Sequence, residues 1–350
     1  MSLPSCQARS HVFDAADIGK ARLWDLGRKK TVRCFCPSPK EDNADIASVC
    51  HGENDFSDLV AVAYNTSVAL FDVREPALVA RKAAMSFHLH QDEVNHVAMS
   101  SLHGRTHLAA ADDNGELLFY DLSAGKLLRR ISGAHDNICA SVVFRTGHAW
   151  QALSGGLDGK LAHWNYNKMR ALATFHPARA SMPSQNQIVN PRFVYGVACD
   201  GSGNRAAAAL GDGTVAIYDL QTKHLVQELH ACENMVNAVE WAPFAPADRA
   251  LVLCGGSDGY VAAIESSVDV SSEDVAGVCL PELRDVVDAL RVRGAEGTEA
   301  DSSPMLKLMC SSQINSIACS SDGRVYVGDQ GEDVLEFNLR CTHSAGAART

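Results

Sequence analysis

The sequence predicts an all-β protein that folds as a single seven-bladed β-propeller. First, short runs of alternating apolar residues, the pattern of half-buried strands, recur along the 350 residues. Second, tight-turn residues recur about every 45 to 50 residues, a spacing typical of four strands per propeller blade. Third, each recurrence closes with a bulky apolar or aromatic residue that an acid or amide follows.

The segment 133–165 is the clearest copy of the repeating unit. It begins with Gly-x-His at 133–135, continues through alternating apolar residues, and turns at 156–159, which read Gly-Leu-Asp-Gly. Glycine and aspartate readily adopt the backbone angles that tight turns need. Three short strands joined in this way leave apolar faces uncovered, so we expect the unit to stack on copies of itself.

The distance from the turn to the closing residue is the same in every copy. Six residues separate Asp158 from Trp164, and the same separation occurs in six other places. The closing residues are Trp24, Phe71, Tyr120, Trp164, Tyr218, Ile264 and Phe337, followed in that order by Asp25, Asp72, Asp121, Asn165, Asp219, Glu265 and Asn338. Seven matches in register predict a propeller over residues 11–339, with an extension at 1–10 and a tail at 340–350.

The expected strands follow from the apolar runs between turns. Blade one has strands only at 11–14 and 21–25, so it is predicted to be incomplete: either the start of the chain is missing or the ring closes with borrowed strands. The other six blades are predicted at 46–49, 59–64 and 67–72; 94–99, 108–111 and 117–121; 138–144, 150–154 and up to 165; 193–199, 206–210 and 214–219; 236–241, 251–254 and 260–265; and 314–319, 325–328 and 334–338.

Two inserts interrupt the repeat. Residues 176–192, rich in proline and polar residues, predict a loop before blade five. Residues 266–303, between blades six and seven, are acidic and contain a predicted short helix at 281–293, with proline in its first turn and arginines at its end. Two interpretations stay open for this helix: it leans on the propeller rim, or it docks a partner.

Composition excludes several classes of protein. The net charge of −11 does not suit a general nucleic-acid binder, whose affinity comes from clustered lysine and arginine. No apolar run approaches the roughly 18 to 20 residues of a membrane span, and the N-terminus lacks the order of a secretory signal. Twelve cysteines without a Cys-x-x-Cys pair are expected to be small core residues of a protein in the cytoplasm or nucleus.

The Trp24-Asp25 pair, repeated with variations seven times, resembles the signature of the WD-repeat family. In that family a histidine, a serine, an aspartate and a tryptophan of one blade form a structural hydrogen-bond network. The resemblance gives these roles to His135, Ser154, Asp158 and Trp164. A Ser-His-Asp hydrolase is the competing interpretation.

Blades three and six are expected to carry fragments of this network, His90 with Asn114 and His230 with Asp258, which favours structure over catalysis. We expect no cofactor and no metal. The sequence Asp-Asp-Asn-Gly at 112–115 resembles the start of a calcium loop but lacks its later glutamate.

The order of the turn motifs narrows the resemblance to one member of the family. That narrower resemblance implies that the protein is a candidate substrate receptor of a cullin-4 RING ubiquitin ligase. Such receptors carry an aromatic-Asp-x-Arg box whose arginine contacts the damaged-DNA-binding adaptor. Phe71, Asp72 and Arg74 match this box, and Arg340 ends a looser copy at 337–340. The alternative is that Arg74 is a solvated residue at a strand end.

Three functions are therefore weighed. The first is a non-catalytic scaffold for protein partners, acting as a monomer within a complex, since propellers present variable loops on a rigid ring. The second is a reader of a short basic peptide, such as a histone tail, in the central channel of an acidic protein. The third is a propeller enzyme, for which the sequence shows no metal or acid cluster.

Overall fold

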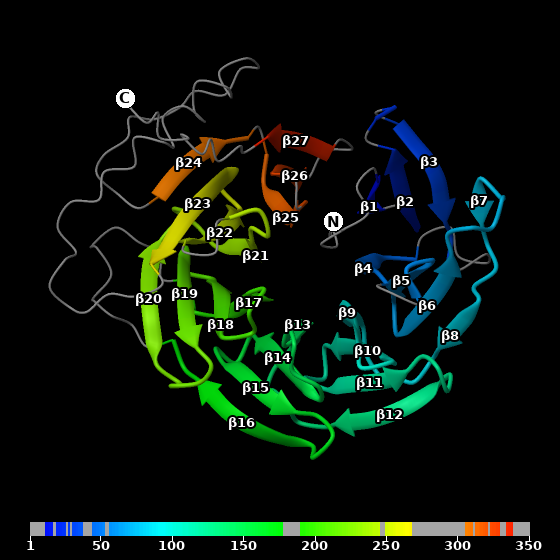
Figure 1. The fold of residues 1–350 in the computed structure, drawn as a ribbon, viewed down its shortest axis with the longest axis horizontal. Helices are drawn as coiled ribbons and strands as arrows, with labels where there is room; N and C mark the ends of the chain where they lie inside the picture. Colours follow the sequence, from blue (N-terminus) through cyan, green and yellow to red (C-terminus); the bar gives the residue numbers. More distant parts are fainter. Residues whose placement is uncertain are drawn as a thin grey trace, which may run out of the picture.

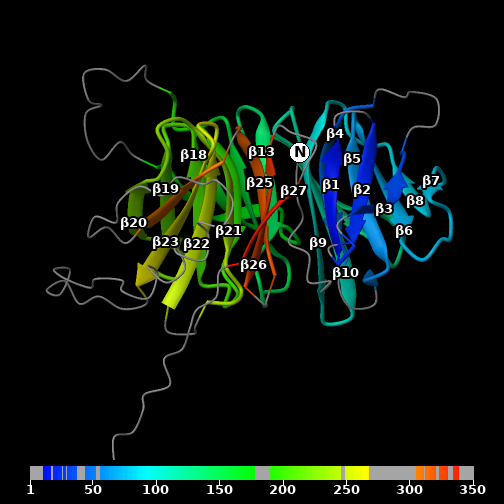
Figure 2. The same cartoon turned by 90° about the horizontal axis from the view of Figure 1, so that it is seen from above.

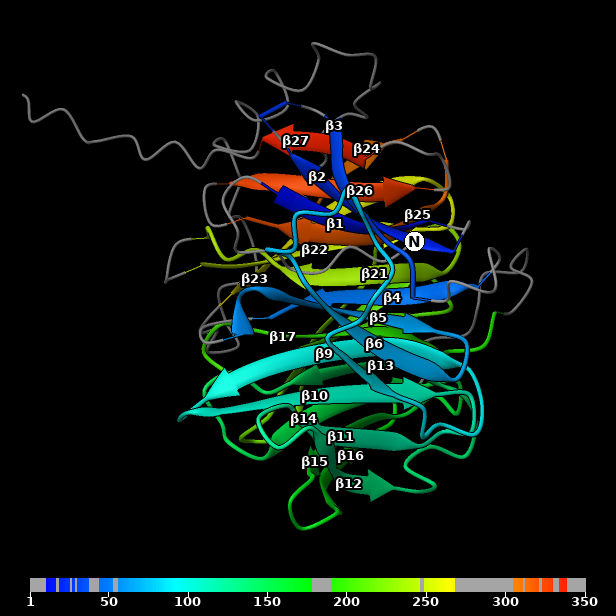
Figure 3. The same ribbon diagram turned by 90° about the vertical axis from the view of Figure 1, so that its right-hand side faces the viewer.

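The computed structural model describes residues 11–16, 19–25, 27–28, 30–37, 44–52, 56–177, 190–245, 249–267, 305–310, 312–320, 323–329 and 334–338. In these ranges the regular elements are β-strands, grouped in seven sheets around a common axis (Figure 1). Figure 2 views the ring from its edge, and Figure 3 views it from the side of β3 and β7. The predicted all-β propeller with seven blades is confirmed.

Blades two to six each contain four antiparallel strands. The predicted strands all recur in the structure, with bounds that differ by a few residues. Blade two has β4 (Ile46–His51), β5 (Leu59–Tyr64), β6 (Ser67–Asp72) and β8 (Met85–Phe87); blade three has β9 (Val94–Leu102), β10 (Arg105–Asp112), β11 (Leu117–Asp121) and β12 (Lys126–Ile131); blade four has β13 (Cys139–Phe144), β14 (Gln151–Gly156), β15 (Leu161–Asn165) and β16 (Arg170–Phe175). Blade five has β17 (Val194–Cys199), β18 (Arg205–Leu210), β19 (Thr214–Asp219) and β20 (Leu225–His230); blade six has β21 (Val236–Trp241), β22 (Arg249–Gly256), β23 (Tyr260–Ser267) and β24 (Met305–Met309).

Blade one differs from these in the place its strands occupy. Val12 pairs with Trp24 as Leu108 pairs with Tyr120 in blade three, so its first strand corresponds to the second strand of the other blades. Among the described residues, nothing fills its innermost position. A parallel pairing adds β7, which follows the third strand of blade two, on the outside. Blade one has β1 (His11–Ala16), β2 (Lys20–Asp25), β3 (Lys30–Phe35) and β7 (Val79–Ala80).

Blade seven has three strands in the described part of the chain, β25 (Ile314–Cys319), β26 (Arg324–Asp329) and β27 (Val334–Asn338). The predicted helix at 281–293, most of both inserts, the two terminal segments and Arg340 lie outside the described residues. Within the described residues, no helix is long and apolar enough to cross a membrane.

The turns that join second and third strands explain the repeated Asp-Gly and Asn-Gly pairs. Gly115, Gly159, Gly213 and Gly259 have φ angles of 70°, 75°, 86° and 84°, in the left-handed region that glycine adopts without steric cost. Blade two has Asn65 at φ 43° instead. These turns set the register of each hairpin, and with it the side chains that face the neighbouring blade.

The core lies between blades rather than inside one of them. Phe35 of blade one packs on Phe71 of blade two, with ring centroids 5.5 Å apart, and apolar clusters fill each of the interfaces from blade two round to blade seven. Close approach near the axis requires small residues: a Cβ added to Gly155 would lie 2.4 Å from the side chain of Val194 in the next blade. The ring is therefore held by contacts between residues far apart in sequence.

Candidate functional site

The first candidate, in blade four, is a buried hydrogen-bond network. His135 bonds through Nδ1 to Asp158 at 2.9 Å and through Nε2 to the Ser154 hydroxyl at 2.7 Å. Trp164 Nε1 donates to the same hydroxyl at 2.8 Å. Asp158 also accepts the backbone N–H groups of Asp136 and Lys160. The structure thus brings together the four residues named from the sequence.

The environment of this network closes it to a substrate. Ser154 is fully buried and His135 is 2 % exposed, so no molecule reaches the hydroxyl without opening the blade. Burial lowers the pKa of His135 and outweighs its bond to Asp158, which keeps the imidazole neutral. Burial acts to raise the pKa of Asp158, but hydrogen bonds from His135 and from the Asp136 N–H lower it by more. The net pKa of Asp158 is therefore lowered, and the carboxylate stays ionised. Such satisfied, buried groups suit a structural role.

The second candidate is the end of β6, where the motif Phe-Asp-x-Arg lies. Phe71 is 1 % exposed and belongs to the core between blades one and two, so it cannot contact a partner directly. Asp72 accepts the backbone N–H of Arg74 at 2.8 Å and a two-pronged bond from its guanidinium, through Nε at 3.0 Å and Nη2 at 2.7 Å. This bond lowers the pKa of Asp72 to about 2.

Arg74 itself is a surface group. Its side chain is 68 % exposed and forms a second ion pair, 3.1 Å long, with Asp58. The residues from Arg74 to Val79 are all exposed, and Leu78 and Val79 are 76 % and 43 % exposed. We call Arg74, Leu78 and Val79 the Arg74 surface. It combines one cation with apolar groups within six residues of chain, at the seam where β7 pairs with β3.

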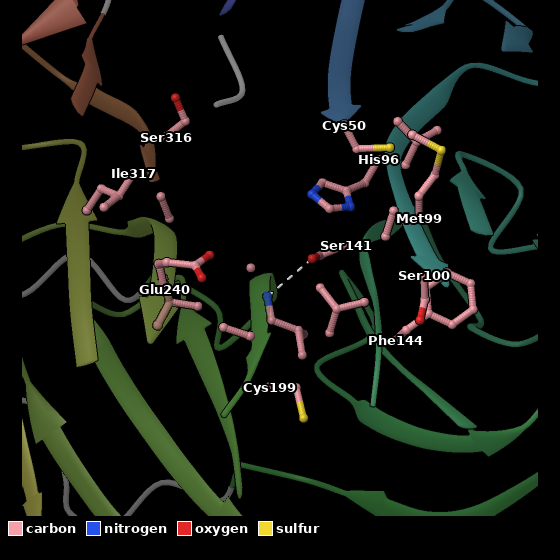
Figure 4. Close-up of a pocket in the computed structure, with 18 of the residues that line it drawn as sticks. Cys50, His96, Met99, Ser100, Ser141, Phe144, Cys199, Glu240, Ser316 and Ile317 are labelled. Carbon is pink, nitrogen blue, oxygen red and sulfur yellow. Dashed lines mark hydrogen bonds between the residues drawn. The ribbon is translucent and has the colours of Figure 1, made fainter. Parts of the chain in front are cut away.

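The third candidate is the cavity at the centre of the ring, of about 440 Å³, which we call the channel (Figure 4). It is lined by the innermost strands of blades two to seven, β4, β9, β13, β17, β21 and β25. In each of these strands a bulge leaves the second residue unpaired, so all six have the same register from their first residue. Positions along the six strands can therefore be compared directly.

Position three links neighbouring blades. Ser48 and Ser141 accept the backbone N–H of Val97 and Val197 in the next blade, each at 3.2 Å. Ser316 occupies the same position in blade seven and is 5 % exposed, but its hydroxyl has no hydrogen-bond partner among the described residues. Blade one, the neighbour of blade seven, has no described innermost strand to supply one.

Position five distinguishes one blade from the rest. Cys50, Ala98, Val143, Ala198 and Ala318 hold this position in five blades, and Glu240 of β21 holds it in the sixth. Its carboxylate faces the channel (Figure 4) and has no hydrogen-bond or ion-pair partner in the described part of the chain. Glu240 is partly exposed and lines the channel, and desolvation inside the ring raises its pKa to about 8. Sequence reasoning missed this residue.

Solved structures share this architecture. The WD40 β-propeller domain of Doa1 superposes with a TM-score of 0.66 over 96 % of this chain and 91 % of that one, at 15 % identity. The fold is that of a WD-repeat propeller. A propeller in the mitotic checkpoint complex superposes with a TM-score of 0.69, covering 97 % of this chain and 90 % of that one, also at 15 % identity. No family model matches the sequence.

Two curated proteins are similar to this propeller in sequence. The WD repeat-containing protein 53 homolog of Dictyostelium discoideum is 22 % identical over 294 residues, which are 77 % of this chain and 78 % of the relative. That relative confirms the narrower resemblance noted above, which is to WD repeat-containing protein 53. Cell division cycle 20.4, cofactor of APC complex, from Arabidopsis thaliana is 27 % identical over 158 residues, 43 % of this chain and 32 % of that one. A propeller of this kind indicates a protein-interaction scaffold.

Two of the predicted network fragments are wrong in detail. In blade three, His90 bonds to Asp112 at 2.8 Å, not to Asn114, and Tyr120 bonds to the other ring nitrogen at 3.1 Å. This partner is the last residue of β10, which reaches the histidine because both side chains point into the same fully buried space. In the segment 112–115, which resembles the start of a calcium loop, Asp112 therefore binds a histidine. Among the described residues, no group of three or more His, Cys, Asp or Glu could hold a metal ion.

In blade six, no hydrogen bond joins His230 to Asp258. His230 is exposed at the end of β20, and the N–H of Cys232 takes the bond to Gly213 that corresponds to the bond from His135 to Gly115 in blade four. Both His90 and His135 lie four residues before the innermost strand of their blade, as Cys232 does. This spacing was the signal that could have identified the correct positions.

Proposed function

We propose that this propeller is a non-catalytic scaffold that acts as a substrate receptor of a cullin-4 RING ubiquitin ligase. The adaptor of that ligase, the damaged-DNA-binding protein, would bind the Arg74 surface. The observation that supports this proposal is the different placement of the three motif residues. Phe71 is buried in the core, Asp72 holds the backbone and guanidinium of Arg74, and Arg74 stays exposed. Buried catalysis at Ser154 is disfavoured because the hydroxyl is inaccessible.

The ion pairs of Arg74 do not oppose such docking. Arg74 and Asp58 are 68 % and 44 % exposed, and solvent screens the attraction of such a pair so that it contributes little to stability. A carboxylate of the adaptor can therefore replace Asp58 at little cost, while Asp72 continues to orient the guanidinium. Leu78 and Val79 add apolar area beside it. Two similar proteins are named for multi-protein assemblies, the APC complex and the mitotic checkpoint complex, which also favours work inside a complex.

The test is co-purification of the full chain with the purified adaptor. We expect Arg74→Ala to reduce adaptor binding at least tenfold and to leave the melting temperature of the propeller unchanged, as for other surface substitutions. Arg170→Ala removes an exposed arginine in blade four and serves as the matched control. Equal recovery of the adaptor by wild type and Arg74→Ala would exclude this docking site.

A second candidate function is supported by the channel. An unpaired carboxylate at the centre of an acidic propeller favours a reader of a short basic peptide, such as a histone tail, because opposite charge attracts the peptide and defines its position. This function uses the channel and not the Arg74 surface. The two proposals can therefore be tested with separate variants.

A further inference from the structure

The cost of keeping Glu240 where it is marks it as more than a packing residue. A carboxyl that is largely withdrawn from solvent and has no partner among the described residues is unfavourable, and five of the six blades place a small or aliphatic side chain at the same position. Nothing among the described residues compensates for the carboxyl of Glu240. Groups with strongly perturbed ionisation inside a cavity are candidates for ligand binding.

The walls around Glu240 suit an aliphatic chain that ends in a cation. Cys50, Ala98, Val143 and Ala198 line the same channel and offer apolar surface from four other blades. The stem of a lysine or arginine can pack on such surface while its charged end meets a carboxylate.

We propose that the channel binds the side chain of a lysine or arginine from an extended peptide, and that Glu240 receives its charged end. This subsite rests on the second candidate function, peptide reading, and is independent of the Arg74 surface. In this proposal the group that the channel recognises is a single cationic side chain.

The other titratable groups near Glu240 do not compete with a cation. Burial lowers the pKa of His96, which lines the channel on β9, to about 4, so its ring is neutral and does not repel the ligand. Burial raises the pKa of Cys199 on β17 to about 11 and that of Cys319 on β25 further, so both thiols stay uncharged. Cys254 on β22 is fully buried between blades.

Binding must release the proton of Glu240. With a pKa of about 8, roughly 3 % of the free protein is ionised at pH 6.5 and about 75 % at pH 8.5, whereas lysine and arginine stay charged throughout. Only the ionised form is competent to pair with the cation, so the apparent affinity rises roughly 25-fold over this range.

The experiment measures fluorescence anisotropy of a labelled octapeptide of glycine and serine with one central lysine. A second peptide carries norleucine there, which keeps the aliphatic stem and lacks the charge. We expect the full chain to bind the lysine peptide at least tenfold more tightly than the norleucine peptide at pH 8.5. The affinity for the lysine peptide is expected to fall roughly 25-fold at pH 6.5, which removes a tenfold preference.

Two variants separate the subsite from peptide reading in general. Glu240→Gln is expected to abolish both the lysine preference and its pH dependence. Glu233→Gln, which removes the same charge from an exposed residue, is expected to change neither. Thermal melting of both variants checks that the ring stays folded. Equal binding of the two peptides by the wild-type chain overturns peptide reading and the subsite together. A lysine preference that survives in Glu240→Gln overturns the assignment of Glu240 alone.

Discussion

Blades four and six have the same strand order and turn, but different side chains hold them together. Blade four uses His135, Ser154 and Trp164, joined by hydrogen bonds through one serine hydroxyl. The corresponding residues of blade six are Cys232, Cys254 and Ile264, which are 0 % exposed and belong to one apolar cluster. The two blades show that polar and apolar packing can support the same turn.

One position of the network holds the same residue type, aspartate, in both blades. Asp258 accepts the backbone N–H groups of Glu233 at 2.6 Å and Tyr260 at 3.2 Å. These bonds correspond to those that Asp158 makes in blade four, at 3.0 and 3.1 Å. Stabilising the turn backbone is therefore separable from the bonds to histidine, serine and tryptophan.

The largest loss of stability is expected when the turn aspartate of each blade is replaced by alanine, and the two losses are expected to differ. Asp158→Ala removes the acceptor of the buried His135 ring and of two backbone N–H groups, together with the ion-pair partner of Lys160, so we expect a loss of about 2 to 4 kcal/mol in the free energy of unfolding. Asp258→Ala removes two backbone bonds and is expected to cost about 1 to 2 kcal/mol. Urea unfolding of both variants measures the difference. Equal losses would show that the bond to His135 adds nothing.

A reciprocal exchange of the blade centres gives an intermediate effect. Ser154→Cys leaves the His135 Nε2 without a strong donor and the Trp164 Nε1–H without a strong acceptor, and Cys254→Ser places a hydroxyl among apolar groups. Each change is expected to cost about 1 to 3 kcal/mol, because buried polar groups without partners are unfavourable. Calorimetric melting of the two variants tests this. An exchange that either blade tolerates without loss would mean that the two types of packing are interchangeable at this position.

The smallest expected effect concerns the histidine that the sequence suggested for blade six. His230→Ala is expected to change the free energy of unfolding by less than about 0.5 kcal/mol, since the ring is exposed and makes no bond to Asp258. His135→Ala, the matched variant in blade four, removes two buried bonds and is expected to cost about 2 to 3 kcal/mol. Chemical denaturation compares the two. A comparable loss in both would restore His230 to the network.

The sequence was most informative where local rules apply. Alternation of apolar residues and the left-handed preference of Gly159 and its counterparts depend on neighbours in the chain, so strands and turns were predicted nearly at their observed bounds. The four network residues of blade four were named correctly because their spacing follows from the same register. His90 was paired with Asn114 instead of Asp112, since a separation in sequence does not define which carboxylate reaches the ring.

Other features depend on contacts that no local pattern encodes. β7 is too short to recognise as a strand, and its parallel pairing with β3 joins residues that are far apart in the chain. The guanidinium of Arg74 was expected to project from the surface, but it also folds onto Asp72 and Asp58. The pairing of β7 with β3 forms only when blades one and two meet, and the contact with Asp58 forms only when blade two folds.

By itself, the sequence determined the number of blades, the position of each turn and the residues that close each third strand. It did so because backbone preferences and period-two alternation act over a few neighbouring residues. Only the tertiary structure decided that Glu240 faces the channel and that Ser154 is sealed from solvent. The first depends on a ring that arranges β4 and β25, more than 260 residues apart, around one axis, and the second on the packing of His135 and Trp164 over Ser154 in blade four.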